Sequence, residues 1–544
     1  MKKSKSFFAL IVLLFLNIYT KAQIDTAWIR TWDSQQWDQT EAITTDEANN
    51  IYVAGWSYEW NTNEDFIFAK YDPNGNLVWS RIRNYTSGDQ ATKILYDHQG
   101  HIYIAGFVNG SYSTTGGALC LMKYSTDGDS LWEFVDFNTS VAQVSAMEMD
   151  HDGNIVLAGF DGGTLGSAVF VTIKIDPQGN ELWYQTFNNN GPNESNRIYG
   201  MCIDAANNIY VTGVCDEWTN FATDIFTIKY APNGDTVWVR QFNSPANNYD
   251  SGWKIILDQD NHLIVGGQVA TSGPAQTDYV ILKYDTSGTL LYSKYFNYPG
   301  PQSFDNFKDL MVDDSGNIYL LGNSSTNNAQ NTVRMELIKF NADGDTLWTA
   351  RWGNASSYEP RQMVKDAQNN IYITGFYYDS NTNTGYNGFT ISYDVNGHER
   401  WEHIYTDTSN SEQELYALAL DANNDLVVTG RTHSSSFFDF LTIKYTNSTS
   451  GIPVLPEIQA DLSLRCDPNP VSSISVIHFS LNNDAETFFR VLDLNGREIR
   501  RMLTGIHRAG TYSFPFNSNG LSQGVYFIQM ISGNQTIQKK IIVE

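Results

Sequence analysis

Cysteine is scarce in this chain of 544 residues, which contains only four. They are Cys120, Cys202, Cys215 and Cys466. None has the Cys-x-x-Cys spacing of a zinc site. Cys202 and Cys215 are close in sequence, but a turn near Ala206 places Cys202 opposite Tyr210. We therefore expect no disulfide between them and interpret all four as small apolar fillers.

Basic residues are also few. Lysine and arginine total 34 against 60 aspartates and glutamates, which gives a net charge of −26. Binding of nucleic acid requires a basic surface, so this balance excludes a nucleic-acid partner. An acidic surface of this kind is typical of a protein that works outside the cytoplasm.

Long apolar runs are absent after the N-terminus, so no transmembrane segment is expected in the mature chain. Lys2, Lys3 and Lys5 precede an apolar run from Phe7 to Tyr19, too short to span a bilayer comfortably. The pattern predicts a signal peptide over residues 1–22, cut before Gln23. The alternative is an N-terminal anchor helix.

Apolar residues with helical periodicity are missing as well. The sequence instead contains a repeat. The decapeptide "DEANNIYVAG" (46–55) returns in eight versions that end at Gly55, Gly106, Gly159, Gly213, Gly267, Gly322, Gly375 and Gly430. The period of 51 to 55 residues falls in the range of propeller-type arrays. Each unit holds four short runs rich in Ile, Val, Tyr, Phe and Trp, bounded by Asn, Gly and Asp. We call these strands A to D.

The ends of the repeat region predict how it closes. The eighth unit stops after its third strand near Tyr445, and "IDTAWIRTW" (24–32) matches the fourth strand "GDTLWTARW" (344–352). Residues Asp25 to Trp32 are therefore expected to complete the last blade. The prediction is an all-β chain with an eight-bladed β-propeller over 23–447, closed by its N-terminal strand. The pattern resembles secreted bacterial proteins with SBBP-type β-propeller repeats, a family whose label implies seven blades.

The last part of the chain has a different pattern. A linker is expected at 448–458, and alternating strands with Gly and Asn turns predict a small β-sandwich over 459–544. This tail resembles the type A C-terminal sorting domain of the type IX secretion system. The positions that match are Pro468, Asn469, Pro470, Gly496, Gly510, Tyr512, Gly524, Tyr526, Lys539 and Lys540. The resemblance implies the secretion machinery as a partner and a location outside the cell or on its surface. The alternative is an ordinary accessory sandwich.

Loop lengths predict where a ligand binds. The A–B and C–D turns are uniformly short, whereas the B–C and D–A loops on the opposite face are long and variable. Variable loops on a rigid scaffold are typical binding positions. Aromatic candidates for stacking on a glycan or protein ligand are Trp56, Trp60, Trp218, Tyr377, Tyr378 and Tyr386. The alternative is that these rings close the apolar edges of the blades.

Three sets of charged residues recur. Asp38, Asp89, Asp250 and Asp305 precede strand A in four units, and such carboxylates either bind a hard cation such as Ca²⁺ or cap their own loops. An aspartate opens every A–B turn: Asp46, Asp97, Asp150, Asp204, Asp258, Asp313, Asp366 and Asp421. We interpret these as turn formers. A strand C lysine, expected to pair with turn carboxylates, is replaced by Ser392 in one unit.

No catalytic motif is recognisable. Nucleophile elbow, phosphate loop and zinc-spaced histidines are all missing, and nothing singles out two of the sixty acids as a glycosidase pair. The sequence therefore favours a secreted or surface binding module rather than an enzyme. The alternatives are a polysaccharide hydrolase or lyase with its site in the central channel, and a structural or adhesion component.

Overall fold

A computed structural model describes the chain from Ile24 to Val543 with short gaps. The gaps are 35, 60–62, 86–87, 109–116, 137–141, 163–167, 189–195, 218–221, 271–276, 298–302, 327–332, 354–356, 379–384, 406–411, 434–436, 447–461, 468–470, 472–473, 482–484, 494–496, 508–509 and 533–534. The predicted signal peptide and linker, and Trp60, Trp218, Pro468, Asn469, Pro470 and Gly496, lie outside the described residues. No helix in the described part of the chain has the length and apolar character of a membrane span. The chain divides into two compact units, Met1–Ser448 and Thr449–Glu544.

The first unit consists of antiparallel groups of four strands. The inner strands are β2 (Trp37–Thr45), β6 (Gln90–Tyr96), β10 (Ala142–Met149), β14 (Arg197–Ile203), β18 (Asp250–Leu257), β22 (Ser303–Val312), β26 (Ser357–Lys365) and β30 (Gln413–Leu420). The second strands are β3 (Ile51–Glu59), β7 (His101–Val108), β11 (Ile155–Asp161), β15 (Ile209–Glu217), β19 (Leu263–Ala270), β23 (Ile318–Thr326), β27 (Ile371–Tyr378) and β31 (Leu426–His433).

The remaining strands complete each group toward the outside of the ring. The third strands are β4 (Asn63–Tyr71), β8 (Ala118–Ser125), β12 (Val169–Ile175), β16 (Ala222–Tyr230), β20 (Thr277–Tyr284), β24 (Val333–Phe340), β28 (Tyr386–Tyr393) and β32 (Phe438–Thr446). The outer strands are β5 (Leu77–Arg83), β9 (Ser130–Asp136), β13 (Glu181–Phe187), β17 (Thr236–Phe242), β21 (Leu290–Phe296), β25 (Thr346–Trp352), β29 (Glu399–Tyr405) and β1 (Asp25–Trp32).

Hydrogen bonding assembles these strands into six separate four-stranded sheets and one sheet of eight strands, β22 to β29. The large sheet is two antiparallel groups joined only through the parallel pair Val333 and Ser357. In every group, the strands succeed one another from the centre of the ring outward. The sequence pattern of four strands per repeat therefore corresponds to the observed sheets.

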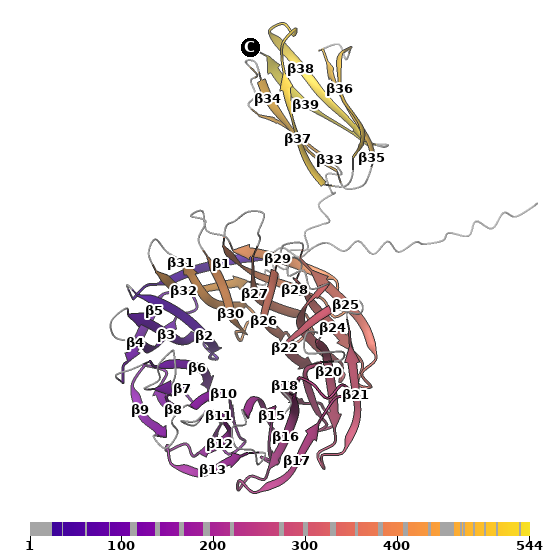
Figure 1. Ribbon diagram of the computed structural model, residues 1–544. Coiled ribbons are helices and arrows are strands. Elements are labelled where there is room, and N and C mark those ends of the chain that lie inside the picture. The colour runs from indigo at the N-terminus through magenta and orange to yellow at the C-terminus, as the bar shows by residue number, and fades with distance from the viewer. Residues whose placement is uncertain are drawn as a thin grey trace, which may run out of the picture. The chain divides into compact units, whose positions relative to one another are not determined.

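The prediction that the N-terminal strand completes the last group is confirmed. β1 pairs antiparallel with β32, with Asp25 opposite Thr446 and Trp32 opposite Phe440. Each inner strand contacts the inner strands of its two neighbours, and β2 of the first group contacts β30 of the last. The groups consequently form a closed ring, with the inner strands facing its middle (Figure 1).

The core of the ring lies between neighbouring groups. One apolar cluster combines Tyr52 and Phe68 of the first group with Cys120 and Tyr124 of the second. At the closure, Trp28 packs in one cluster with Tyr71 of the first group. A single group would leave both of its apolar faces exposed to water, which is why the repeat must recur.

The cysteines lie where the turn prediction placed them. Cys202 is opposite Tyr210, and Cys215 is opposite Asp224 in the next ladder, so the two thiols are not bridged. Cys120, Cys215 and Cys466 are each buried in an apolar cluster, and Cys202 packs against another. Their interpretation as apolar fillers is confirmed.

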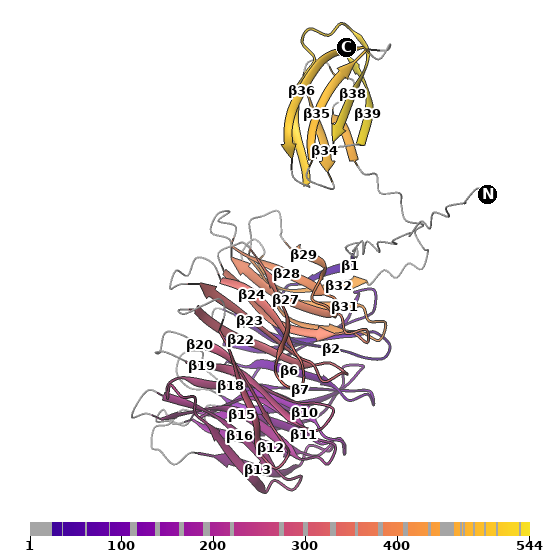
Figure 2. The ribbon, with the colours of Figure 1, turned by 90° about the vertical axis from the view of Figure 1, so that its right-hand side faces the viewer.

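The described residues of the second unit form seven strands in two small sheets. The strands are β33 (Leu462–Asp467), β34 (Ile474–Leu481), β35 (Ala485–Leu492), β36 (Glu498–His507), β37 (Gly510–Asn517), β38 (Gly524–Ser532) and β39 (Gln535–Val543). One sheet has the order β33-β34-β37. The other has the order β36-β35-β38-β39, whose strands are labelled in Figure 2. Phe479 from the first sheet and Phe489 and Ile528 from the second belong to one buried cluster, so the two sheets share a core.

Candidate binding site in the ring

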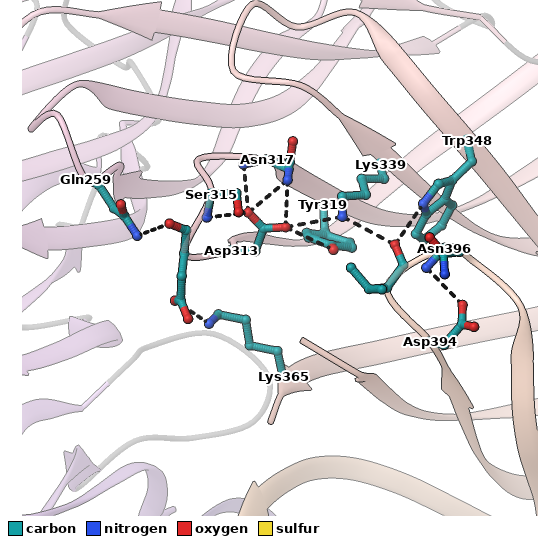
Figure 3. Close-up of polar contacts among 12 residues, drawn as sticks. Gln259, Asp313, Ser315, Asn317, Tyr319, Lys339, Trp348, Lys365, Asp394 and Asn396 are labelled. Carbon is teal, nitrogen blue, oxygen red and sulfur yellow. Dashed lines mark hydrogen bonds and ion pairs between the residues drawn. The ribbon is translucent and has the colours of Figure 1, made fainter. Parts of the chain in front are cut away.

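The repeated aspartates hold the short A–B turns, as the sequence predicts. In the sixth group, the Oδ1 of Asp313 accepts hydrogen bonds from the backbone N–H groups of Ser315 and Asn317, both at 2.9 Å. Its Oδ2 accepts from the hydroxyl of Tyr319 (Figure 3). Burial alone would raise the pKa of Asp313, but the bonds from Asn317, Ser315 and Lys339 outweigh burial and lower that pKa.

The same backbone bonds recur at every equivalent aspartate. The aspartates that accept them are Asp46, Asp97, Asp150, Asp204, Asp258, Asp313, Asp366 and Asp421. Their role as turn formers is confirmed.

The repeated lysines join one group to the next. Lys339 pairs with Asp313 at 3.2 Å and also donates to the carbonyl of Val395, which belongs to the following group. Trp348 donates its indole N–H to the same carbonyl at 3.2 Å, as Figure 3 shows. Lysines and turn aspartates also pair in three other groups, at Lys174–Asp150, Lys283–Asp258 and Lys444–Asp421. The predicted pairing is confirmed for these four lysines, whereas Lys70, Lys123 and Lys229 donate to a backbone carbonyl of the following group.

Arg400 replaces the lysine that the seventh group lacks. Its Nη1 donates to the hydroxyls of Tyr372 and Ser392, both at 3.1 Å, and its guanidinium carbon lies 5.7 Å from the centre of the Tyr372 ring. In the sixth group, the Nζ of Lys339 lies 4.8 Å from the equivalent Tyr319 ring. A cation over this tyrosine is therefore retained although the strand that supplies it has changed.

A β-bulge interrupts every inner strand at the same place. In the first group, Thr40 is opposite Gly55 and Ala42 is opposite Ala54, so Glu41 has no partner in the ladder. The equivalent residues of all groups lie five positions before the turn aspartate. They are Glu41, Thr92, Ser145, Tyr199, Trp253, Lys308, Arg361 and Tyr416. We call them the bulge residues.

The bulge explains why each decapeptide ends in glycine. That glycine lies opposite the residue before the bulge, where the inner strand comes unusually close. A Cβ on Gly55 would lie 1.9 Å from the carbonyl oxygen of Gln39, and one on Gly106 would lie 1.9 Å from that of Gln90. Only glycine permits this approach of two backbones.

A cavity of about 550 Å³ lies among the inner strands. All eight bulge residues line it, so residues from every group reach one space. A bulge re-aims its extra side chain without using a ladder hydrogen bond. The volume falls within the usual range of small-molecule pockets. The bulge residues therefore form the candidate binding site.

Aromatic and charged residues make up six of the eight bulge residues. Tyr199 and Trp253, from adjacent groups, are stacked with ring centres 4.1 Å apart and an angle of 17° between planes. Trp253 remains 36% exposed. Further round, the guanidinium of Arg361 lies 5.3 Å from the centre of the Tyr416 ring, and Lys308 pairs with Glu359.

A second layer of charge borders the bulge residues. Lys254 pairs with Asp309 at 2.7 Å, and the attraction of that carboxylate raises the pKa of Lys254. Burial lowers the pKa of Lys93, although Glu41 opposes this shift. Burial likewise raises the pKa of Glu148, which Lys254 opposes. Lysines and carboxylates from different groups thus act on one another at the cavity.

The described aromatic candidates occupy different environments. Trp56 is buried and directs its indole N–H toward the Oε1 of Glu41 at 3.4 Å, so it contacts a bulge residue. Tyr377 is stacked on Tyr358, with ring centres 5.1 Å apart. Tyr378 and Tyr386 contact each other at 5.7 Å, and Tyr386 is 37% exposed at the edge of a long loop.

The four aspartates suggested as cation ligands are buried, and three accept bonds from their own loops. Asp38 accepts from the backbone N–H of Ser34, Asp89 from that of Tyr85, and Asp250 from that of Ser244. The backbone carbonyl of Asp305 accepts from Thr277.

Ligand atoms of three carboxylates come together at one of these positions. Asp38 has Asp33 and Asp439 beside it, with the three possible ligand atoms within 4.8 Å of one another. Asp89, Asp250 and Asp305 do not join this group of described residues. A second such group, Asp258, Asp260 and His262, lies in one A–B turn.

The described sorting residues lie in the second unit. Gly510 and Gly524 begin β37 and β38, and Tyr512 is stacked on Phe479 at 5.2 Å. The hydroxyl of Tyr526 donates to the carbonyl of Ser522. Lys539 and Lys540 are exposed on β39.

Sequence reasoning overlooked the bulge residues and Arg400. A signal for the bulges was present, because a glycine inside a strand pattern is typical of a bulge. No comparable signal marks Arg400, because its role depends on the folded chain bringing its guanidinium close to Tyr372.

Two family models match parts of the chain. Residues 467–544 match the family described as "Secretion system C-terminal sorting domain", and residues 49–77 match "Domain of unknown function (DUF5122) beta-propeller". A curated relative, "Uncharacterized WD repeat-containing protein L264" of Acanthamoeba polyphaga mimivirus, is 20% identical over 536 residues. The match covers 74% of this chain but only 36% of the viral protein.

Solved structures with a similar arrangement have low sequence identity. The WD40 domain of SCAP from fission yeast is 10% identical, with a TM-score of 0.42, and the match covers 79% of this chain and 99% of that one. A polysaccharide lyase of family PL25, an ulvan lyase, is 12% identical with a TM-score of 0.40, over 69% and 95% of the two chains. Similarity at this level says nothing about ligands.

Proposed function

We propose that this secreted β-propeller repeat protein, which carries the C-terminal sorting domain of the type IX secretion system, is a binding module whose ligand occupies the central cavity. We count β22–β25 and β26–β29 as separate blades, which makes the propeller eight-bladed. The sorting domain accounts for export to the outside or the outer surface, with the secretion machinery as partner.

The observation that carries the proposal is the set of bulge residues. The side chains that hold the ring are nearly identical from unit to unit, whereas the bulge residues differ in charge, size and aromaticity. Residues that vary on a constant scaffold, and that all face one cavity, are typical of ligand recognition.

A glycan is the ligand that the cavity suits best. The stacked Tyr199 and Trp253 offer a flat aromatic surface, and Ser145 on the adjoining blade offers a hydroxyl group. Tyr378 ends β27 and Tyr386 begins β28, so the two rings flank a long loop that offers further contacts to a chain-like ligand. A protein segment is the other ligand predicted from the sequence.

Two of the three described carboxylates that line the cavity, Asp309 and Glu41, are already bonded within the ring and only Glu148 is not, which favours binding over hydrolysis by a pair of carboxylates. Asp309 is paired with Lys254 and also accepts the backbone N–H of Met363 at 2.9 Å. Glu41 accepts from the side chain of Gln39 at 2.5 Å. Carboxylates engaged in this way are poorly placed to act as the acid and base of a glycosidase.

A glycan array with the purified protein tests the proposal. We expect retention of a defined set of glycans, and loss of that signal in Trp253→Ala, because truncation removes the stacking surface. Leu347→Ala is the matched control, since Leu347 is 52% exposed on the outer strand β25. Release of shorter products would favour the enzyme alternative. Ligand binding that Trp253→Ala leaves unchanged would contradict the cavity as the site.

A further inference from the structure

The two halves of the cavity differ in how far their polar groups are already bonded. On the side of the sixth to first blades, Lys308 pairs with Glu359, Arg361 lies over Tyr416, and Tyr416 donates to Glu414. Arg431 then pairs with Glu414 at 2.7 Å. These contacts form a continuous network, so this half serves mainly to fix the shape of the ring.

The other half, from the second to the fifth blade, retains two charged side chains without such bonds, although its Lys254 pairs with Asp309 and its Thr92 donates to the carbonyl of Val144. Lys93 on β6 makes no hydrogen bond or ion pair with any described residue, although it lines the cavity. Its neighbour in the strand is the bulge residue Thr92. A lysine that is held inside a ring without a hydrogen-bonded partner is suited to an anionic ligand group.

The groups around Lys93 indicate what the rest of that ligand offers. Glu148 on β10 also has no hydrogen-bond partner among the described residues, and its carboxyl group can bond sugar hydroxyls. Trp253 presents an aromatic surface beside Lys254, which acts electrostatically on Lys93. An anionic group, hydroxyl groups and a flat ring face are combined in one class of compound, the acidic sugars.

We propose that the cavity binds an acidic glycan, in which a sugar carboxylate pairs with Lys93 while a sugar ring stacks on Trp253 and its hydroxyls bond Glu148. This inference rests on the function proposed above and specifies its ligand. The network of the opposite half leaves little unpaired charge there. The ligand therefore lies against the second to fifth blades. An acidic peptide shares the carboxylates but lacks the hydroxylated ring face.

Titration calorimetry with matched ligands tests the inference on the full protein. The probes are oligomers of galacturonate, mannuronate and guluronate, each beside its methyl ester, which keeps the ring and removes the charge. We expect at least one acid to bind about 10- to 100-fold more tightly than its ester. Lys93→Gln should abolish this preference, and Lys93→Arg, which keeps the charge, should retain it.

Two further variants complete the design. Lys294→Gln on the outer strand β21 is the control, and it should leave the preference for the acid unchanged. Trp253→Ala should weaken binding of the acid and of the ester alike. Thermal melting of each variant verifies that the ring is folded.

The possible failures are distinguishable. Equal binding of acid and ester, or a preference that survives in Lys93→Gln, overturns the acidic glycan but leaves the binding function in place. Tighter binding of poly-glutamate than of every oligosaccharide, lost in Trp253→Ala, assigns the cavity to a protein ligand and overturns the glycan. Binding to none of these probes overturns the acidic glycan, and an empty glycan array then counts against the binding function as well.

Discussion

Trp28 donates its indole N–H to the backbone carbonyl of Pro73 at a distance of 3.0 Å. Trp28 lies in β1, which completes the last blade, and Pro73 lies in the C–D turn of the first blade. Gly75 in that turn has a φ of 78°, and a Cβ there would lie 2.6 Å from the Trp28 ring. One tryptophan thus joins the N-terminal strand to the blade that follows the closure.

Replacing Trp28 should open the ring at its closure. We expect Trp28→Ala to lower the free energy of unfolding by about 3–5 kcal/mol, because a buried indole and its hydrogen bond are lost. Since no covalent link ties β1 to β32, limited proteolysis should also cut the chain within 24–32. Trp348→Ala is the matched control, because Trp348 makes the same contact in a strand connected at both ends. Equal protection of β1 in both variants would contradict this role.

Arg400 should be needed only because Ser392 replaces the repeated lysine. We expect Arg400→Ala to lower the free energy of unfolding by about 1–2 kcal/mol through loss of the contacts to Tyr372. Adding Ser392→Lys should recover most of that loss, because the repeated Lys–Asp pair is restored. Chemical denaturation of the single and double variants measures both effects, with the exposed Arg334→Ala as control. If the double variant is no more stable than Arg400→Ala, Arg400 does not compensate for the missing lysine.

Asp250 should make stability depend on pH. Burial raises the pKa of its carboxyl from the usual 3.8 to about 6. The folded chain therefore holds this proton more tightly than the unfolded chain. The contribution to stability is full below about pH 4 and is lost as pH rises through 6. Asp250→Asn cannot titrate, so its stability relative to the wild type should increase between pH 4 and pH 7.

Melting temperatures across this range check the Asp250 prediction. The exposed Asp343→Asn serves as control, and it should follow the wild type. A constant difference between Asp250→Asn and the wild type from pH 4 to pH 7 would show that this carboxyl does not titrate in the window.

Calcium binding stays a prediction for the aspartates that precede the inner strands. Asp38 allows the most specific test of it. Because Asp33 and Asp439 bring ligand atoms within 4.8 Å of Asp38, Ca²⁺ at 100 times its Kd should stabilise the fold by about 2.7 kcal/mol. Asp439→Asn should remove that gain, whereas Asp89→Asn should retain it. Melting curves recorded with Ca²⁺ and with a chelator test this prediction. An unchanged melting temperature of the wild type would contradict it.

Much of the fold could be predicted because short sequence patterns encode it and recur in every unit. The turn aspartates, the short turns and the apolar strands each depend on neighbours in sequence, and the match between 24–32 and 344–352 predicts the closure. Each of these patterns recurs often enough to be recognised without homologues.

The candidate site was harder to predict because it depends on the pairing register of the strands and on which side chains extend into the cavity. The loop aromatics drew attention, yet Tyr377 packs on Tyr358 and Trp56 is buried against Glu41. Whether Glu41 leaves the ladder depends on the pairing of Thr40 and Ala42 with β3, which composition does not reveal. The final glycine of the decapeptide was the one clue, and its meaning required the approach of Gln39.

The bulges also place the residues that contact a ligand at positions different from those that stabilise the fold. Ser145 and Trp253 have no partner residue in the ladders of their strands, so exchanging either costs the scaffold little. A lineage that carries this ring can change its preference one blade at a time, while the glycines and aspartates stay fixed. Relatives that share the repeat should therefore differ most in the partners that they select.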